Sequence, residues 1–136
     1  MFLRNGWYSA IWSHDLKEKP VAKTFLNDKI VLFRNDRGEV GALEDCCCHR
    51  AAPLSLGEVS GATLACGYHG LKFDVNGKCV EVPGQADVPS GAKVRSYPVH
   101  EKNNVVWIWM GEPAKADTSK VPDMPWLSNP KWATTP

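Results

Sequence analysis

The hydrophobic pattern of this chain is that of short strands separated by turns. Apolar and β-branched residues cluster over a few positions at a time, with Gly, Asn and Asp between the clusters, which is typical of strands and tight turns. The predicted strands are residues 7–12, 21–26, 29–34, 39–43, 71–73, 79–82, 94–99 and 105–110. Helix is suggested weakly, as a single turn at residues 13–16. Strands this short predict an all-β fold, an antiparallel sandwich or a small barrel.

Turn signals join neighbouring strands. The pair Asn27-Asp28 lies between two predicted strands and indicates a β-hairpin. Further turns are predicted at residues 35–38, 74–77 and 102–104, where asparagine recurs and two of the three segments end in glycine. After Met110 the pattern is lost, and residues 111–136 carry five prolines with no apolar period. This stretch predicts an extended tail or linker, either disordered or docked through Trp126 and Trp132.

Composition excludes several classes of protein. The chain has 136 residues, enough for one domain with a hydrophobic core, and its formal net charge of +1 gives no general attraction to nucleic acid or to an anionic membrane. Its longest apolar run, residues 105–110, is far shorter than the roughly 20 residues that span a bilayer. The first residues show no secretory signal, so we expect a cytoplasmic protein.

The five cysteines suggest metal chemistry. An odd number, with three of them consecutive at positions 46–48, makes a poor disulfide framework. In a chain without an export signal such cysteines more often bind metal or react. Cys79 lies in a predicted strand and is expected to be a small buried hydrophobe.

Two loops, at about residues 44–57 and 64–72, carry the candidate ligands. Cys47 and His49 form a C-x-H motif, and Cys66 and His69 form a C-x-x-H motif after sixteen intervening residues. Each loop therefore supplies one thiolate and one imidazole. This set suits a [2Fe–2S] cluster in which one iron takes two sulfurs and the other takes two nitrogens, the arrangement of a Rieske centre.

Two other sites use the same residue types. A structural zinc ion accepts two cysteines and two histidines, but zinc pairs usually have two to five residues between them, and C-x-H has one. Gly67 and Gly70 also favour a cluster, because glycine lets backbone N–H groups approach inorganic sulfide. A Cys–His hydrolase leaves the duplicated pair unexplained. The zinc site and the hydrolase stay open as alternatives at this point.

The two loops resemble the N-terminal domain of Rieske non-haem iron oxygenases. The similar stretches are residues 45–57 and 64–79, with further likeness at residues 5–10, 94–98 and 106–109. The likeness is strongest to the aromatic O-demethylase and monooxygenase branch, that of the vanillate and dicamba demethylases. The resemblance implies a Rieske-type antiparallel β-sandwich with a small cluster-binding subdomain. It assigns residues 1–112 to this domain and residues 113–136 to a Pro-rich linker leading to a C-terminal catalytic domain.

The resemblance also assigns roles to residues. Cys47 and Cys66 would bind one iron, and His49 and His69 the other, which accepts the electron. Neighbouring positions with an expected role in supporting the cluster or docking a partner are Arg50, Gly67, Tyr68 and Gly70. Cys46 and Cys48 fall outside the motif.

Two departures from the oxygenase pattern are visible, and one difference from respiratory Rieske proteins indicates the subtype. The oxygenase loops usually have proline where this chain has Cys48 and Gly67, so two more N–H groups are available near the cluster. Respiratory Rieske proteins carry a disulfide between the loops, and the corresponding positions here are Ala52 and Tyr68. The oxygenase or ferredoxin type is therefore favoured.

The activity implied by the resemblance is one-electron transfer. A flavin- and ferredoxin-type reductase would reduce the cluster, and a mononuclear Fe(II) in the catalytic domain would receive the electron, usually across subunits of a homotrimer. We expect no such iron site in this chain, since only His14 and His100 are left to bind it. The alternative is a free-standing Rieske ferredoxin, against which stands the tail beyond Met110.

Overall fold

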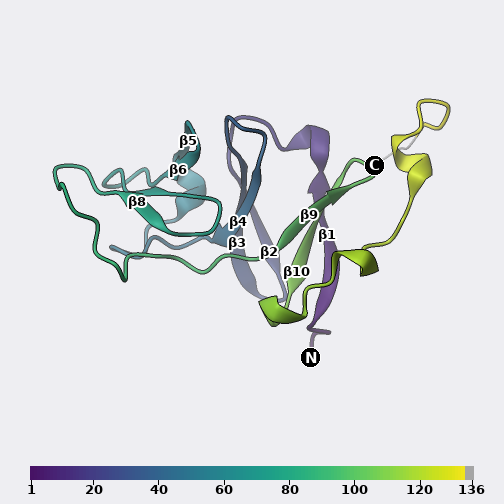
Figure 1. The fold of residues 1–136 in the computed structure, drawn as a ribbon, viewed down its shortest axis with the longest axis horizontal. Helices are drawn as coiled ribbons and strands as arrows, with labels where there is room; N and C mark the ends of the chain where they lie inside the picture. Colours follow the sequence, from purple (N-terminus) through teal and green to yellow (C-terminus); the bar gives the residue numbers. More distant parts are fainter. Residues whose placement is uncertain (134–136) are drawn as a thin grey trace. The chain divides into compact units, whose positions relative to one another are not determined.

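The computed structural model describes residues 1–133 and is all-β, as predicted. It divides into two compact units, Leu16–Tyr97 and Met1–Asp15 with residues 98–133 (Figure 1). Every strand pair is antiparallel, and the helical segments in the described part of the chain are 3₁₀ turns of three or four residues. None of these helices is long and apolar enough to cross a membrane.

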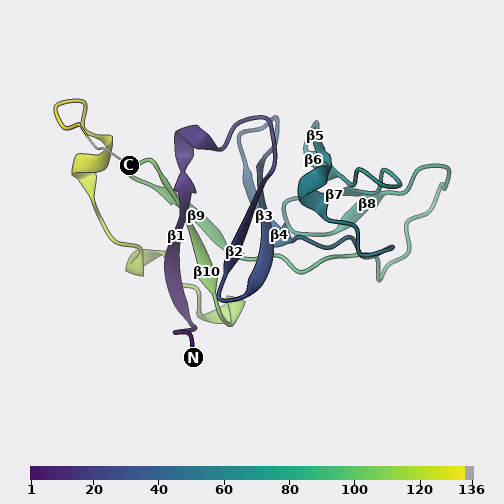
Figure 2. The same cartoon turned by 180° about the vertical axis from the view of Figure 1, so that it is seen from behind.

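The unit Leu16–Tyr97 holds two antiparallel sheets, which lie side by side in Figures 1 and 2. The first has the order β2-β3-β4, with strands Val21–Phe25, Asp28–Arg34 and Val40–Glu44. The second has the order β5-β6-β7-β8, with strands Glu58–Ser60, Thr63–Ala65, Lys72–Phe73 and Cys79–Glu81. A short 3₁₀ helix, η2 (Leu54–Leu56), precedes β5. The two candidate ligand loops both belong to this unit.

The hairpin between β2 and β3 is confirmed, with its turn one residue earlier than predicted. Phe25 pairs with Asp28, so the two turn residues are Leu26 and Asn27, at φ 49° and 69°. Two consecutive positive φ values define the type I′ turn, whose twist matches that of the flanking strands. Strands β5 and β6 were not predicted, because each has three residues and their pattern is too short to register as alternation.

The predicted strand at residues 94–99 is wrong. In this stretch Ser96 forms an isolated bridge with Leu43, and the N–H of Tyr97 donates to the carbonyl oxygen of Ala42. Regular strand begins only at Val99, in the other unit. Pro98 separates the two segments, and proline has no N–H with which to continue a ladder.

The core of this unit includes the cysteines of both loops. Cys47, Cys66 and Cys79 are buried in one cluster with apolar side chains of both sheets, among them Phe33 and Phe73. Cys79 is thus a buried hydrophobe, as predicted. Because the candidate ligands Cys47 and Cys66 are part of the core, the packing of the whole unit positions them.

The other unit is a three-stranded sheet of order β1-β10-β9. Its strands are Gly6–Trp12, Val105–Met110 and Val99–Lys102, and β1 is followed by the 3₁₀ turn η1 (Ser13–Asp15). The predicted turn between β9 and β10 is confirmed, with Asn103 and Asn104 at φ 53° and 63°. Three further 3₁₀ turns follow, η3 (Pro113–Lys115), η4 (Thr118–Lys120) and η5 (Pro125–Ser128).

The tail is docked on this sheet over residues 117–127. Val121 is buried with Trp107, the N–H of Met124 donates to Oδ1 of Asn103 (2.9 Å), and Nε1 of Trp7 donates to the carbonyl oxygen of Asp117 (2.9 Å). The two tryptophans on which docking was predicted do not contribute to it, because Trp126 is 48% and Trp132 65% exposed. Assignment of residues 113–136 to an interdomain linker stays a prediction, and residues 134–136 lie outside the described part.

Candidate metal centre

The first loop closes on itself around Cys47. The N–H of Cys47 donates to the carbonyl oxygen of Ala52 (2.8 Å), and the N–H of Ala51 donates to that of Cys47 (2.9 Å). Ala51 has a φ of +56°, a left-handed conformation that costs an alanine of order 1 kcal/mol. The strained residue lets the chain reverse within five residues and presents His49 at the bend.

The second loop repeats this design. The N–H of Cys66 donates to the carbonyl oxygen of Leu71 (2.8 Å), and the N–H of Gly70 donates to that of Cys66 (3.0 Å). Gly70 has a φ of +77°, which explains the glycine at this position. The cysteine in each loop thus bonds to the residues four and five positions later, although the histidine follows at a different spacing. Two loops of one design supply the four candidate ligands.

The structure brings the four side chains together in two pairs. The thiols of Cys47 and Cys66, each 3% exposed, lie in one buried cluster, and Cys66 is close enough to contribute to the raised pKa of Cys47. Burial, with smaller contributions from the neighbouring thiols, raises the pKa of Cys47 to about 11. The rings of His49 and His69 lie edge to face with their centroids 4.8 Å apart. The pairing of cysteine with cysteine and histidine with histidine crosses the two loops.

This arrangement fits a [2Fe–2S] cluster with mixed ligands. Such a cluster needs two thiolates for one iron and two imidazoles for the other, and the loops present that set already sorted. Because ligand thiols bind metal as thiolates, binding would release the proton that burial holds on Cys47. Residues 47, 49, 66 and 69 are therefore the residues that would hold the group.

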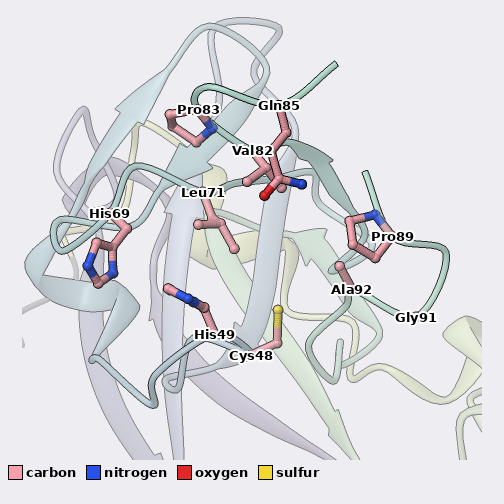
Figure 3. Close-up of a pocket in the computed structure, with 10 residues that line it drawn as sticks. All are labelled: Cys48, His49, His69, Leu71, Val82, Pro83, Gln85, Pro89, Gly91 and Ala92. Carbon is pink, nitrogen blue, oxygen red and sulfur yellow. The ribbon is translucent and has the colours of Figure 1, made fainter. Parts of the chain in front are cut away.

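A cavity of about 500 Å³ adjoins the two histidines. Besides His49 and His69, it is lined by Cys48 and Leu71 of the loops and by residues of the segment 82–92. Figure 3 shows this segment opposite the first loop, with Pro83, Gln85 and Pro89 along it. The segment was not predicted as part of the site, because it carries no ligand residue.

The predicted neighbours of the site are found in different settings. Tyr68 is 62% exposed, and the centroid of its ring lies 3.9 Å from that of the His69 ring. Arg50 is exposed. Gly67 was expected to admit an N–H to sulfide, which stays a prediction, and its lack of a side chain also has a packing reason. A Cβ there would lie 2.9 Å from the carbonyl oxygen of Leu56.

Sequence reasoning missed one anchoring pair, Asp45 and Ser55. The carboxylate of Asp45 accepts from the N–H (2.7 Å) and the hydroxyl (2.6 Å) of Ser55, which joins the two ends of the first loop. The residue types were the only sequence indication of these hydrogen bonds, because Asp and Ser side chains often bond to nearby backbone. The spacing of ten residues carried no signal.

The remaining histidines lie in the other unit. His14 stacks on Trp12 and its Nε2 lies 3.5 Å from the Asp15 carboxylate, as expected of a surface histidine beside an acid. His100 differs from the expectation, because it is half-buried with its ring at the edge of Trp7.

Comparison with known proteins identifies the family. A family model described as the Rieske [2Fe–2S] domain matches residues 6–98. The chain belongs to this family. It is 45% identical over its whole length to the toluene-4-sulfonate monooxygenase iron–sulfur subunit TsaM1 of Comamonas testosteroni, covering 40% of that protein. It is 44% identical over 98% of its length to the oxygenase component of dicamba O-demethylase of Stenotrophomonas maltophilia, again covering 40%.

Solved structures agree with this Rieske assignment. A crystal structure of dicamba monooxygenase bound to dicamba matches with a TM-score of 0.90 and 44% identity, over 95% of this chain and 39% of that one. Another structure of that enzyme is described with non-haem iron and dicamba. The chain therefore spans about two-fifths of the length of the relatives it matches. The cofactor of this Rieske domain is the [2Fe–2S] cluster, while its ligation by the four named residues stays a prediction.

Proposed function

We propose that this Rieske domain transfers single electrons within the oxygenase component of an aromatic O-demethylase or monooxygenase. The observation that carries the proposal is that the candidate ligands lie in two pairs, the two buried thiols of Cys47 and Cys66 and the two adjacent imidazoles of His49 and His69. The relatives support an oxygenase component over a free-standing ferredoxin, because they are named as monooxygenase or demethylase components.

The cysteines and the histidines of the two loops have different roles. A bound [2Fe–2S] cluster supplies a one-electron carrier. Cys47 and Cys66, buried in the core, keep water from the thiolate side. His49 and His69 border the cavity, and each retains a second ring nitrogen that can donate a hydrogen bond to a redox partner.

The remaining parts of the proposal concern the whole protein. The electron donor would be a reductase of the flavin and ferredoxin type, and the acceptor a mononuclear Fe(II) in a C-terminal oxygenase domain. Residues 1–112 would form the electron-transfer domain and residues 113–136 the connection. A homotrimer in the cytoplasm completes the proposal. The relatives' names support the multicomponent system, since they include a "system iron-sulfur subunit" and an "oxygenase component".

Absorption and EPR spectra of the purified protein test the proposal. We expect a red-brown protein that, after reduction with dithionite, shows a rhombic [2Fe–2S] signal with a low average g value. A colourless protein containing one zinc per chain, and giving no such signal after reconstitution with iron and sulfide, would contradict it.

Arg50 is the proposed contact for the reductase. It is exposed and follows His49 directly, so reversing its charge should slow reduction of the cluster by the reductase about tenfold at low salt. Stopped-flow reduction of Arg50→Glu measures this. Arg37→Glu, at an exposed arginine in the turn between β3 and β4, is the matched control. Equal rates for the two variants would remove Arg50 from the docking surface.

A further inference from the structure

The aromatic ring of Tyr68 lies against one of the candidate ligands. Its centroid is 3.9 Å from that of the His69 ring, and the two ring planes meet at 51°. His69 in turn meets His49 edge to face, with 4.8 Å between the ring centroids. The three rings therefore form a continuous series of contacts, with Tyr68 at one end.

Neither burial in the core nor a hydrogen bond accounts for the place of the Tyr68 ring. The residue is 62% exposed and is not a member of the buried cluster that includes Cys66. Within residues 1–133 its hydroxyl makes no hydrogen bond. The N–H of Gly70 donates to the carbonyl oxygen of Cys66 (3.0 Å), which encloses Tyr68 and His69 in one tight turn. The turn brings the two rings together, and the contact between them keeps the Tyr68 ring in place.

The two candidate histidines differ in the residue that precedes them. Tyr68 precedes His69 and contacts its ring, whereas Cys48 precedes His49 and its small side chain lines the cavity. In the described part of the chain, the only aromatic ring in contact with His49 is that of His69. His69 is therefore covered by a neighbouring aromatic side chain of its own loop, and His49 is not.

An aromatic neighbour against a ligand imidazole has two physical consequences. It limits rotation of the imidazole, because turning that ring would break the contact between the two rings. It also occupies space that water would otherwise fill. Contacts of this kind orient metal ligands, and solvent exposure is one of the factors that set the potential of an iron–sulfur cluster.

We propose that Tyr68 is a positioning residue for His69, whose aromatic ring fixes the orientation of the imidazole and shields it from water in the metal-bound protein. The inference rests on the proposed function in that it takes His69 as a metal ligand. The role belongs to the ring of Tyr68 and not to its hydroxyl, because the ring makes the contact. Tyr68 itself binds no metal.

Metal release from the purified holoprotein to a chelator is the first test. Tyr68→Ala should lose metal about tenfold faster than wild type, the lower end of the range usual for residues that orient metal ligands. Tyr68→Phe keeps the ring and should release metal at the wild-type rate. Leu56→Ala is the matched control, because Leu56 is an apolar side chain of the first loop that is 78% exposed, and it should also release at the wild-type rate.

Electron–nuclear double resonance (ENDOR) of the reduced protein measures the orientation of the imidazole. The nitrogen hyperfine couplings of one histidine should change in Tyr68→Ala and stay those of wild type in Tyr68→Phe and Leu56→Ala. Tyr68→Leu keeps apolar bulk without a planar ring and should change the couplings as well, which provides the measurement if the alanine variant loses its metal on purification. A residue that only docks a partner would leave these couplings of the isolated protein unchanged.

The midpoint potential should change in a defined direction. A [2Fe–2S] core with two thiolates and two neutral imidazoles has no net charge when oxidised and one negative charge when reduced. Water stabilises the charged form, so its entry beside His69 in Tyr68→Ala favours reduction. The equilibrium constant for reduction should rise about threefold, an upward shift of about 28 mV at 59 mV per tenfold change.

Two results would overturn the role of Tyr68. One is Tyr68→Ala with the release rate and couplings of Leu56→Ala, and the other is Tyr68→Phe behaving as Tyr68→Ala does. Metal and sulfide analysis of the wild-type protein comes first. A zinc protein would contradict the proposed electron transfer, and the release rates would still test Tyr68, because the same loops would hold the zinc. Failure of the proposed function and failure of this inference are therefore distinguishable.

Discussion

Substitution of Cys66 by alanine is expected to abolish binding of the [2Fe–2S] cluster, whereas substitution of Cys79 is expected to leave it in place. Both thiols are buried in the same core, at 3% and 1% exposure, so the two changes remove similar packing. They differ in that only Cys66 is paired with Cys47 across the loops. Without one thiolate the cluster loses a covalent ligand that no other buried group at this position replaces.

Iron and sulfide analysis of the two variants measures this result. Iron should fall from about two per chain to near zero in Cys66→Ala and stay near two in Cys79→Ala. Cys47→Ala should behave as Cys66→Ala does, and Cys48→Ala as Cys79→Ala. Full iron content in Cys66→Ala would show that this cysteine is not a ligand. The second thiolate ligand would then have to be Cys46, Cys48 or Cys79.

The second large effect is expected from exchanging both histidines for cysteine. Replacement of neutral imidazoles by charged thiolates stabilises the oxidised cluster, so the midpoint potential of His49→Cys/His69→Cys should fall by at least about 200 mV, toward the range of plant-type ferredoxins. The two rings lie edge to face with their centroids 4.8 Å apart, so the two substituted positions are close neighbours across the loops.

Protein-film or solution redox titration measures the potential, and the EPR average g value should rise in the same variant. His14→Cys/His100→Cys in the other unit is the control and should leave the potential unchanged. A double variant at 49 and 69 that keeps the wild-type potential and g values would exclude the two histidines as ligands of the cluster.

Features that depend on residues close together along the chain could be predicted from the sequence alone. Unbroken apolar runs marked β3 and β10 to within one residue, because a run of four to six apolar residues bounded by turn signals is visible without help from its neighbours. The candidate ligands were also identified from residues close together along the chain, and their role as ligands stays a prediction. The C-x-H and C-x-x-H motifs are short, and the tight turns that present them close on residues one to three positions after each motif.

Contacts between distant segments were decided only by the tertiary structure. Residues 94–97 are apolar enough for a strand, but they meet β4 at one isolated bridge and the chain then leaves for the other unit at Pro98. The wall of the cavity formed by residues 82–92, the bonds of Asp45 to Ser55 and the contact of Leu56 with Gly67 gave no signal in the sequence. Each depends on how segments of no fixed spacing pack together, whereas the ligand motifs depend on spacing alone.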